Sequence, residues 1–340
     1  MLYQYRLFPT KKQISLFKIQ LEEHRNLYNK CLEYKIEQYK NNKLNISAID
    51  LINKFSKIYK KTSNAASLQQ TIRRLDKTYK LFFNKTSGFP RFKAINRFNT
   101  IQYAKHGDGC KLGTKLYLQN IGSISINIHR PCGKIKTLSV TLKYNKMYVN
   151  IFCENNNPLN APKGLAVGID FGIKNIITTS DGLSVKSPVT QKHYQKNINK
   201  ALRKKKYKVV RKINEKIQNK RKDFNHKLSR QVVNQYNIIC LEDLKVKSIQ
   251  SYSTVNYKIN DVAINQLRNF IVYKAESAGK HIVLVNPAYT TQTCSKCGII
   301  KNKELDERLH ICSCGFKTSR DINAALNIKT LGLQSLGLKP

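Results

Sequence analysis

Hydrophobic residues change their spacing along the chain, and these changes divide it into three stretches. After a short strand that Pro9 ends, apolar residues recur at helical spacing to about Phe83, which predicts helices with an interruption near Asn41. From about Phe98 to Cys153 short runs alternate between apolar and polar residues, which is typical of antiparallel strands in a small barrel or sheet. The remainder combines short apolar runs with longer segments of helical period, which predicts an α/β domain.

The expected elements of the last stretch follow from these runs. Strands are expected at 165–170, 174–179, 237–241 and 281–285, and helical regions at 191–236, at 261–278 and from about 320.

The charge of the chain is strongly unbalanced. Lysine and arginine number 62 against 20 aspartates and glutamates, which gives a net charge of +42. Such a surplus repels itself unless a polyanion neutralises it, so nucleic acid is the favoured partner. A ribosomal-type protein and a merely solvated basic surface are the simpler alternatives. Between Lys200 and Lys222 twelve basic residues stand against one acid, Glu215, which makes this segment the most basic candidate surface.

Two features concern the cellular location. The chain has no apolar run long enough to span a bilayer, and its first residues lack the apolar core of a signal peptide. We therefore expect an intracellular protein with no membrane partner, cytoplasmic and nucleoid-associated in a prokaryote rather than secreted. The pattern indicates no particular oligomeric state.

Three carboxylates occupy comparable places at the ends of expected elements. Asp170 and Glu242 each end a buried strand, and Asp321 opens the last helix. Such positions can converge at one edge of a sheet, and clustered carboxylate oxygens are ligands that suit Mg²⁺. Two Mg²⁺ ions about 4 Å apart can activate water and stabilise the leaving oxygen of a phosphodiester. The trio therefore predicts a metal-dependent site for phosphodiester hydrolysis.

Each of these acids also has a simpler interpretation. Asp170 alone fits a turn residue, Glu242 a surface charge and Asp321 a helix cap, so the specificity lies in the ordered set. Asp243 competes with Glu242 for the second position. Because side chains alternate along a strand, Asp243 is expected to face the opposite side, which favours Glu242.

The nine cysteines fall into two groups. Five are scattered and are expected to be packed or without function: Cys31, Cys110, Cys132, Cys153 and Cys240. The other four form a Cys-x-x-Cys pair and a Cys-x-Cys pair separated by 14 residues: Cys294, Cys297, Cys312 and Cys314. This spacing predicts a zinc ribbon holding one structural Zn²⁺, since a closed four-thiolate site leaves no position for catalysis. The second pair is one residue shorter than usual, so His310 is an alternative fourth ligand.

These motifs resemble those of the TnpB family, which insertion sequences encode and which is related to Fanzor proteins and type V CRISPR effectors. The segments Gly-Ile-Asp-Phe-Gly, Leu-Glu-Asp-Leu and Arg-Asp-Ile-Asn-Ala-Ala, at 168–172, 241–244 and 320–325, are similar to the three RuvC motifs. The segment 285–298 is similar to the one that leads into the zinc ribbon of the family, 221–229 to the basic helix before the second motif, and 88–93 to the element between the helical lobe and the barrel. Ser319 stands where many relatives carry an acid.

The resemblance implies a multidomain α/β and α+β architecture. An RNase H-like (RuvC) nuclease domain with an inserted zinc ribbon would follow a wedge β-barrel that carries an inserted helical recognition lobe. The implied boundaries are 1–9 for the first barrel strand, 10–87 for the helical lobe, 88–157 for the barrel, 158–163 for a linker, 164–290 for the nuclease domain, 291–318 for the zinc ribbon and 319–340 for the end of the nuclease domain and the tail.

The resemblance also implies an activity, that of an RNA-guided DNA endonuclease of a transposable element. The guide RNA would come from the element itself, and the target would be double-stranded DNA cut beside a short adjacent motif. Asp170, Glu242 and Asp321 would be the catalytic ligands of Mg²⁺. The basic residues expected to contact nucleic acid are Arg91, Lys93, Arg203, Lys204, Lys205, Lys208, Arg211, Lys212, Lys220 and Arg221. Arg308 is a further candidate near the scissile phosphate, with an ordinary surface arginine as the simpler interpretation.

Two other functions use the same sequence features. A DNA transposase that acts without guide RNA can carry the same three acids, and binding to transposon ends without RNA would favour it. An RNA-guided DNA-binding regulator would occupy its target whether or not Mg²⁺ and Asp170 are present.

Overall fold

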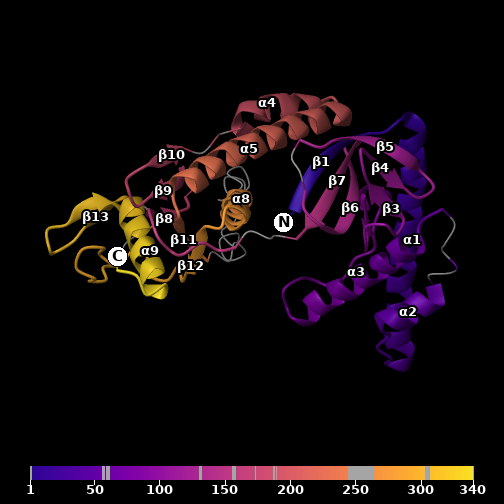
Figure 1. Ribbon diagram of the computed structural model, residues 1–340, viewed down its shortest axis with the longest axis horizontal. Coiled ribbons are helices and arrows are strands. Elements are labelled where there is room, and N and C mark those ends of the chain that lie inside the picture. Colours follow the sequence, from indigo (N-terminus) through magenta and orange to yellow (C-terminus); the bar gives the residue numbers. More distant parts are fainter. Residues whose placement is uncertain are drawn as a thin grey trace. The chain divides into compact units, whose positions relative to one another are not determined.

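The computed structural model describes residues 2–55, 58, 62–129, 132–154, 158–172, 174–186, 188, 190–243, 264–302 and 307–339. The chain divides into two compact units, Met1–Asn155 and Asn156–Pro340, and each has its own hydrophobic core (Figure 1). Within the described ranges, no helix has both the length and the apolar character needed to cross a membrane.

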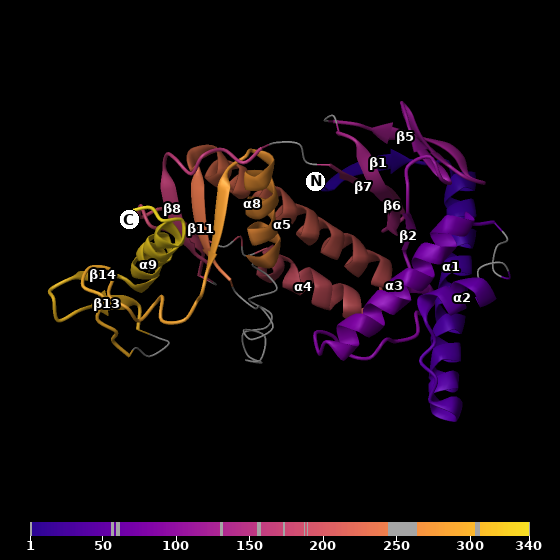
Figure 2. The ribbon, with the colours of Figure 1, turned by 60° about the horizontal axis from the view of Figure 1, so that its bottom comes forward.

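The first unit combines an antiparallel sheet with helices. Its strands are β1 (Leu2–Phe8), β2 (Thr100–Tyr103), β3 (Cys110–Leu112), β4 (Lys115–Leu118), β5 (Gly122–Asn127), β6 (Ile135–Lys143) and β7 (Lys146–Cys153). Its helices are α1 (Lys11–Asn42), α2 (Ala48–Phe55), α3 (Ala65–Phe83) and the short 3₁₀ helix η1 (Ile95–Arg97). The strand order β2-β6-β7-β1-β5-β4-β3 forms a curved sheet that approaches a closed barrel (Figure 2).

The helices of the first unit begin and end where local sequence signals place them. Thr10 caps α1, because its side chain accepts a hydrogen bond from the amide of Gln13 while the Gln13 side chain accepts one from the Thr10 amide. The helix ends at Asn42, and Lys43 then adopts a left-handed conformation. The expected interruption near Asn41 and the end of the helical stretch at Phe83 are therefore confirmed.

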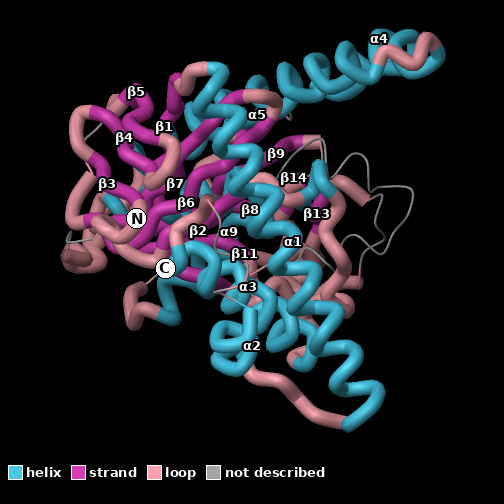
Figure 3. The backbone as a smooth tube through the Cα atoms, turned by 90° about the vertical axis from the view of Figure 1, so that its right-hand side faces the viewer, coloured by secondary structure: helices cyan, strands magenta, loops and turns pink. Residues whose placement is uncertain are grey.

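The second unit contains a mixed sheet, a helical hairpin and further helices. Its strands are β8 (Ala166–Asp170), β9 (Asn175–Thr179), β10 (Ser184–Lys186), β11 (Ile238–Glu242), β12 (His281–Val285), β13 (Leu309–Ile311) and β14 (Lys317–Ser319). Its helices are α4 (Thr190–Arg203), α5 (Tyr207–Gln235), α8 (Ile264–Ser277) and α9 (Arg320–Ser335). The main sheet has the order β10-β9-β8-β11-β12, in which β8, β11 and β12 run parallel and β9 and β10 antiparallel (strands are magenta in Figure 3).

Helices cover both faces of this main sheet, and strand alternation decides which residues meet which helix. Ile239 and Leu241 share one core with residues of α5 and α8, whereas Ile238 and Cys240 share another with residues of α9. Even-numbered residues of β11 therefore face α9, and odd-numbered ones face α5 and α8.

The helical region expected at 191–236 is not continuous. It is a hairpin of α4 and α5 with a turn at 204–206, where Lys205 has a φ of 50°. Two physical reasons account for the break. The run of four cations from Arg203 repels itself within one helical turn, and Tyr194 and Ile198 of α4 fold back to pack on Ile217 of α5. The segment 261–263, expected to begin the following helix, lies outside the described residues.

Candidate active site and metal centre

Two neighbouring strands of the second unit end in carboxylates. The parallel strands β8 and β11 are in register up to the pair Ile169 and Leu241, so the next residues, Asp170 and Glu242, lie side by side at the carboxyl edge of the sheet. Alternation gives Asp170 the same face as Gly168, and Glu242 the same face as Cys240. Both acids therefore belong to the face that α9 covers.

Helix α9 reaches this face because two glycines allow a very close approach. A Cβ atom on Gly168 would lie only 2.0 Å from the carbonyl oxygen of Ala325 in α9. A Cβ atom on Gly332, near the other end of α9, would lie 2.2 Å from Cys240 Sγ of β11. The helix thus rests on the backbone of the sheet, and its first turn brings Asp321 to the strand ends.

The three carboxylates influence one another electrostatically. Burial, followed by the charges of Glu242 and Asp321, raises the pKa of Asp170 to about 8, although part of the side chain reaches solvent. Arg320 and the backbone amide of Phe171 oppose this rise. Burial also raises the pKa of Glu242, which is only 6% exposed. A divalent cation would relieve this concentration of negative charge, and carboxylate oxygens are the donors that Mg²⁺ prefers, so the donor chemistry suits such an ion. Among the described residues, the ligand atoms that lie close enough together to hold an ion are those of the cysteine cluster.

The competing acid Asp243 lies elsewhere. Its Oδ1 accepts a hydrogen bond from Arg268 Nη2 of α8 at 2.9 Å, and its side chain is 55% exposed. Because α8 packs on the opposite face of the sheet from α9, Asp243 points away from Asp170, as strand alternation predicts.

The sequence interpretation missed the partners that hold Glu242. Thr290 Oγ1 donates a hydrogen bond to Glu242 Oε1 at 2.5 Å, and Thr290 is itself 3% exposed. Asn323 and Asn327 of α9 bind the backbone around Thr290. The sequence feature that could have indicated these partners is the pair Asn323 and Asn327, two amide side chains four residues apart on an otherwise small and apolar helix face.

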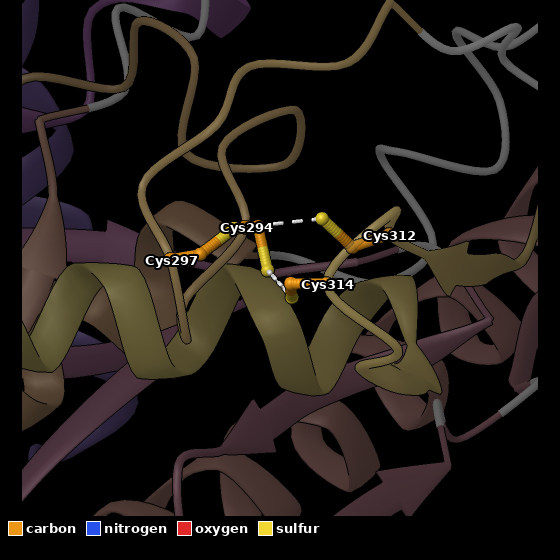
Figure 4. Close-up of side chains that lie close together, drawn as sticks. All are labelled: Cys294, Cys297, Cys312 and Cys314. Carbon is orange, nitrogen blue, oxygen red and sulfur yellow. Dashed lines mark hydrogen bonds between the residues drawn. The ribbon is translucent and has the colours of Figure 1, made fainter.

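The four clustered cysteines come together in the second unit. Their sulfur atoms all lie within 4.8 Å of one another, and Figure 4 shows the side chains converging. Cys294 Sγ and Cys314 Sγ are 3.8 Å apart, and Cys297 Sγ and Cys312 Sγ are 3.5 Å apart. Four thiolates at the Zn–S length of about 2.3 Å in a tetrahedron would be about 3.8 Å apart. The geometry therefore fits one structural Zn²⁺.

One detail supports the four-thiolate interpretation. His310, the alternative ligand, is fully buried in β13 near Phe316, and its ring nitrogens are not among the ligand atoms that gather with the cysteine sulfurs.

The candidate nucleic-acid residues occupy two regions. Arg91 is exposed in the first unit, but Lys93 is half-buried over the ring of Tyr28, and Asn29 binds both its backbone amide and its carbonyl group. The remaining candidates lie at the α4–α5 hairpin, where all but the half-buried Arg221 are exposed: Arg203, Lys204, Lys205, Lys208, Arg211, Lys212, Lys220 and Arg221. A shallow hollow on α4 is lined by Lys196, Asn199, Lys200, Arg203 and Lys204.

Arg308 is fixed close to the last acid. It is exposed, and its carbonyl oxygen accepts a hydrogen bond from the amide of Arg320, next to Asp321, at 2.9 Å. This contact involves the backbone, so it places the residue without assigning a role to its side chain.

Three family models match the chain. One described as "Helix-turn-helix domain" of the OrfB/IS605 group matches residues 2–43, where the structure has β1 followed by the single long helix α1. One described as "Probable transposase" of the same group matches residues 150–252. One described as "Cas12f1-like, TNB domain" matches residues 265–328, which include the four cysteines.

Individual relatives extend these matches. A Streptomyces pristinaespiralis protein named "Putative RNA-guided DNA endonuclease" is 26% identical over 97% of this chain and 89% of its own length. An Escherichia coli K12 protein named "Putative RNA-guided DNA endonuclease InsQ" is 29% identical over 80% of this chain and 75% of its own length. A solved Cas12f1–sgRNA–target DNA complex matches 97% of this chain and 99% of its Cas12f1 chain, with a TM-score of 0.40 and 18% identity, too low a likeness to carry an argument.

Proposed function

The chain belongs to the TnpB/IS605 OrfB family, and we propose that it is an RNA-guided DNA endonuclease of a transposable element. The observation that supports catalysis most directly is that Asp170, Glu242 and Asp321 interact: burial, followed by the charges of Glu242 and Asp321, raises the pKa of Asp170 to about 8. A purely structural cluster of three acids would be unfavourable, because each buried charge raises the cost of ionising the others.

The second unit supports an RNase H-like nuclease domain. Its sheet has three parallel strands with two antiparallel strands at one edge, and both catalytic candidates on the sheet stand at the ends of parallel strands. The first unit would supply the wedge barrel and the helical lobe. The four-thiolate cluster would hold one structural Zn²⁺, and the carboxylates would hold Mg²⁺.

The carboxylates would perform distinct tasks in hydrolysis. Bound Mg²⁺ would supply Lewis-acid activation of the phosphodiester and of water. Asp170 would lie at the centre of the site, because it interacts with both Glu242 and Asp321, and it would lose its proton as the cation binds. Glu242 would stay in one orientation through Thr290, and Asp321 would complete the site from α9.

The basic α4–α5 hairpin supports binding of a guide RNA and target DNA. Base pairing would read the target sequence, and the protein would contact backbone phosphates and a short adjacent motif. The hollow lined by Lys196, Lys200, Arg203 and Lys204 offers four cations and no acid to a phosphate backbone.

The test compares variants of the guide-loaded protein. RNA that co-purifies after expression with the flanking DNA is sequenced, and cleavage of a matching target is then measured for wild type, Asp170→Asn and Asp243→Asn. We expect Asp170→Asn to abolish cleavage while RNA and DNA binding persist, and Asp243→Asn, on the opposite face, to cut at close to the wild-type rate. Undiminished cutting by Asp170→Asn would refute the proposed acid site. Activity on element ends without any RNA would favour a transposase.

A further inference from the structure

Glu242 has a buried hydroxyl partner from outside the sheet. The Thr290 hydroxyl lies 2.5 Å from Glu242 Oε1 and 3.1 Å from the carbonyl oxygen of Pro287. A hydroxyl group has one hydrogen, and an ionised carboxylate is the stronger acceptor, so Thr290 donates to Glu242 when that residue is charged. The contact fixes one carboxylate oxygen of Glu242.

Thr290 is itself held by α9. Asn327 Nδ2 donates to the carbonyl oxygens of Thr290 and Thr293, at 2.8 and 2.7 Å, and Asn323 Nδ2 donates to the Thr293 oxygen at 2.7 Å. The two asparagines stand four residues apart on one face of the helix, and they are 0% and 8% exposed. Buried amides with several partners define a position sharply, because a shift would leave donors unsatisfied.

The same asparagines reach the zinc cluster. Asn323 Oδ1 accepts a hydrogen bond from the amide of Ser295, the residue after Cys294, at 3.0 Å. Asn323 is two residues beyond Asp321. One helix therefore carries an acid of the site, holds the loop that orients a second acid, and binds the backbone beside a thiolate of the cluster.

We propose that Thr290 is a positioning residue for the cation site: it orients Glu242, and Asn323 and Asn327 hold it in register with Asp321. This inference rests on the proposed function only in treating the three carboxylates as cation ligands. Groups that orient metal ligands affect affinity by about 10- to 100-fold when removed. The expected effect is therefore on cation affinity, whatever the nucleic acid is.

The experiment titrates Mn²⁺ into the full-length, zinc-loaded protein without nucleic acid, by calorimetry. Asp170→Asn should lose the binding event, which assigns it to the acid site. Thr290→Val, which keeps the shape and removes the hydroxyl, should weaken Mn²⁺ binding about 10-fold or more, and Thr290→Ser should restore it. Thr71→Val removes another buried hydroxyl, one that contacts His24 in the first unit, and should leave Mn²⁺ affinity unchanged.

Cleavage by the guide-loaded variants separates the two proposals. Thr290→Val should cut more slowly at saturating DNA, with unchanged affinity for DNA. If wild type cuts no DNA while Thr290→Val still weakens Mn²⁺ binding, the endonuclease proposal fails and the positioning role stands. If wild type cuts DNA and Thr290→Val binds Mn²⁺ like wild type, the positioning role is overturned. Equal losses in Thr290→Val and Thr290→Ser would also overturn it, because the hydroxyl would then not be the cause.

Discussion

Replacing Gly168 by alanine tests whether the close packing of α9 places Asp321. The added Cβ would lie 2.0 Å from the Ala325 oxygen and 2.5 Å from the Lys329 nitrogen, whereas ordinary contacts begin at 3.4 Å. The helix must therefore retreat by about 1.4 Å, and overpacking of this kind costs about 1–3 kcal/mol. Asp321 precedes Ala325 by four residues, about 6 Å along the helix, so it moves with the displaced segment.

The expected consequence is a larger loss of activity than of stability. A misplacement of about 1 Å at a reacting centre can cost about 100-fold in rate. We expect Gly168→Ala to fold with a melting temperature lower by several degrees and to cleave guide-matched DNA about 100-fold more slowly. Thermal unfolding and single-turnover cleavage measure the two effects on the same preparation.

Gly332→Ala is the matched control. Its Cβ would meet Cys240 Sγ at 2.2 Å, so it also destabilises the contact between α9 and the sheet, but about 16 Å further along the helix from Asp321. We expect a similar fall in melting temperature, a much smaller fall in cleavage, and partial recovery of stability in combination with Cys240→Ala. Wild-type cleavage by a destabilised Gly168→Ala protein would refute the reasoning, and so would equal losses of cleavage in both glycine variants.

Three further predictions concern the metal cluster and two buried titratable groups. Cys312→Ser should reduce bound zinc from one atom per chain to none, as elemental analysis would show, and a retained zinc would contradict the four-thiolate site. In zinc-loaded protein without Mg²⁺, the folded state keeps the Asp170 proton up to about pH 8, whereas the unfolded state loses it near pH 4. The free energy of unfolding should therefore fall by about 1.4 kcal/mol for each unit by which the pH rises between these values. Urea unfolding of Asp170→Asn should show a shallower dependence on pH than wild type, and identical slopes would contradict the raised pKa of Asp170. Burial lowers the pKa of His24 to about 4, so the first unit should lose about 1.4 kcal/mol per unit as the pH falls from about 6.5, a loss that thermal unfolding of His24→Asn should not show.

Local signals in the sequence were sufficient for much of the fold. The end of the first strand before Pro9 and the end of the helical stretch at Phe83 depend on neighbouring residues, and both are found as expected. The strand ends at Asp170 and Glu242 follow from apolar runs bounded by polar residues, and alternation along β11 correctly separated Asp243 from Glu242.

Features that depend on contacts between residues distant in the sequence could not be predicted from local patterns. The break between α4 and α5 at Lys205 requires Tyr194 and Ile198 to pack back on Ile217. The helical spacing of apolar residues within the segment does not indicate that contact. Thr290 acquires its partner only because a loop after β12 meets a strand 48 positions earlier. Lys93 looks like a surface cation in sequence, yet Tyr28 and Asn29 of α1 hold it half-buried.

The docking of α9 also has a consequence for the folding of the second unit. Asp170 and Asp321 are separated by about 150 positions in sequence, and β8 must pair with β11, some 70 residues away, before the strand ends can meet. Contacts between such distant segments form slowly, because chain entropy must be lost before they contribute stability. Without α9 docked, the sheet carries only two of the three acids. The proposed cation site is therefore complete only after α9 has docked on the sheet.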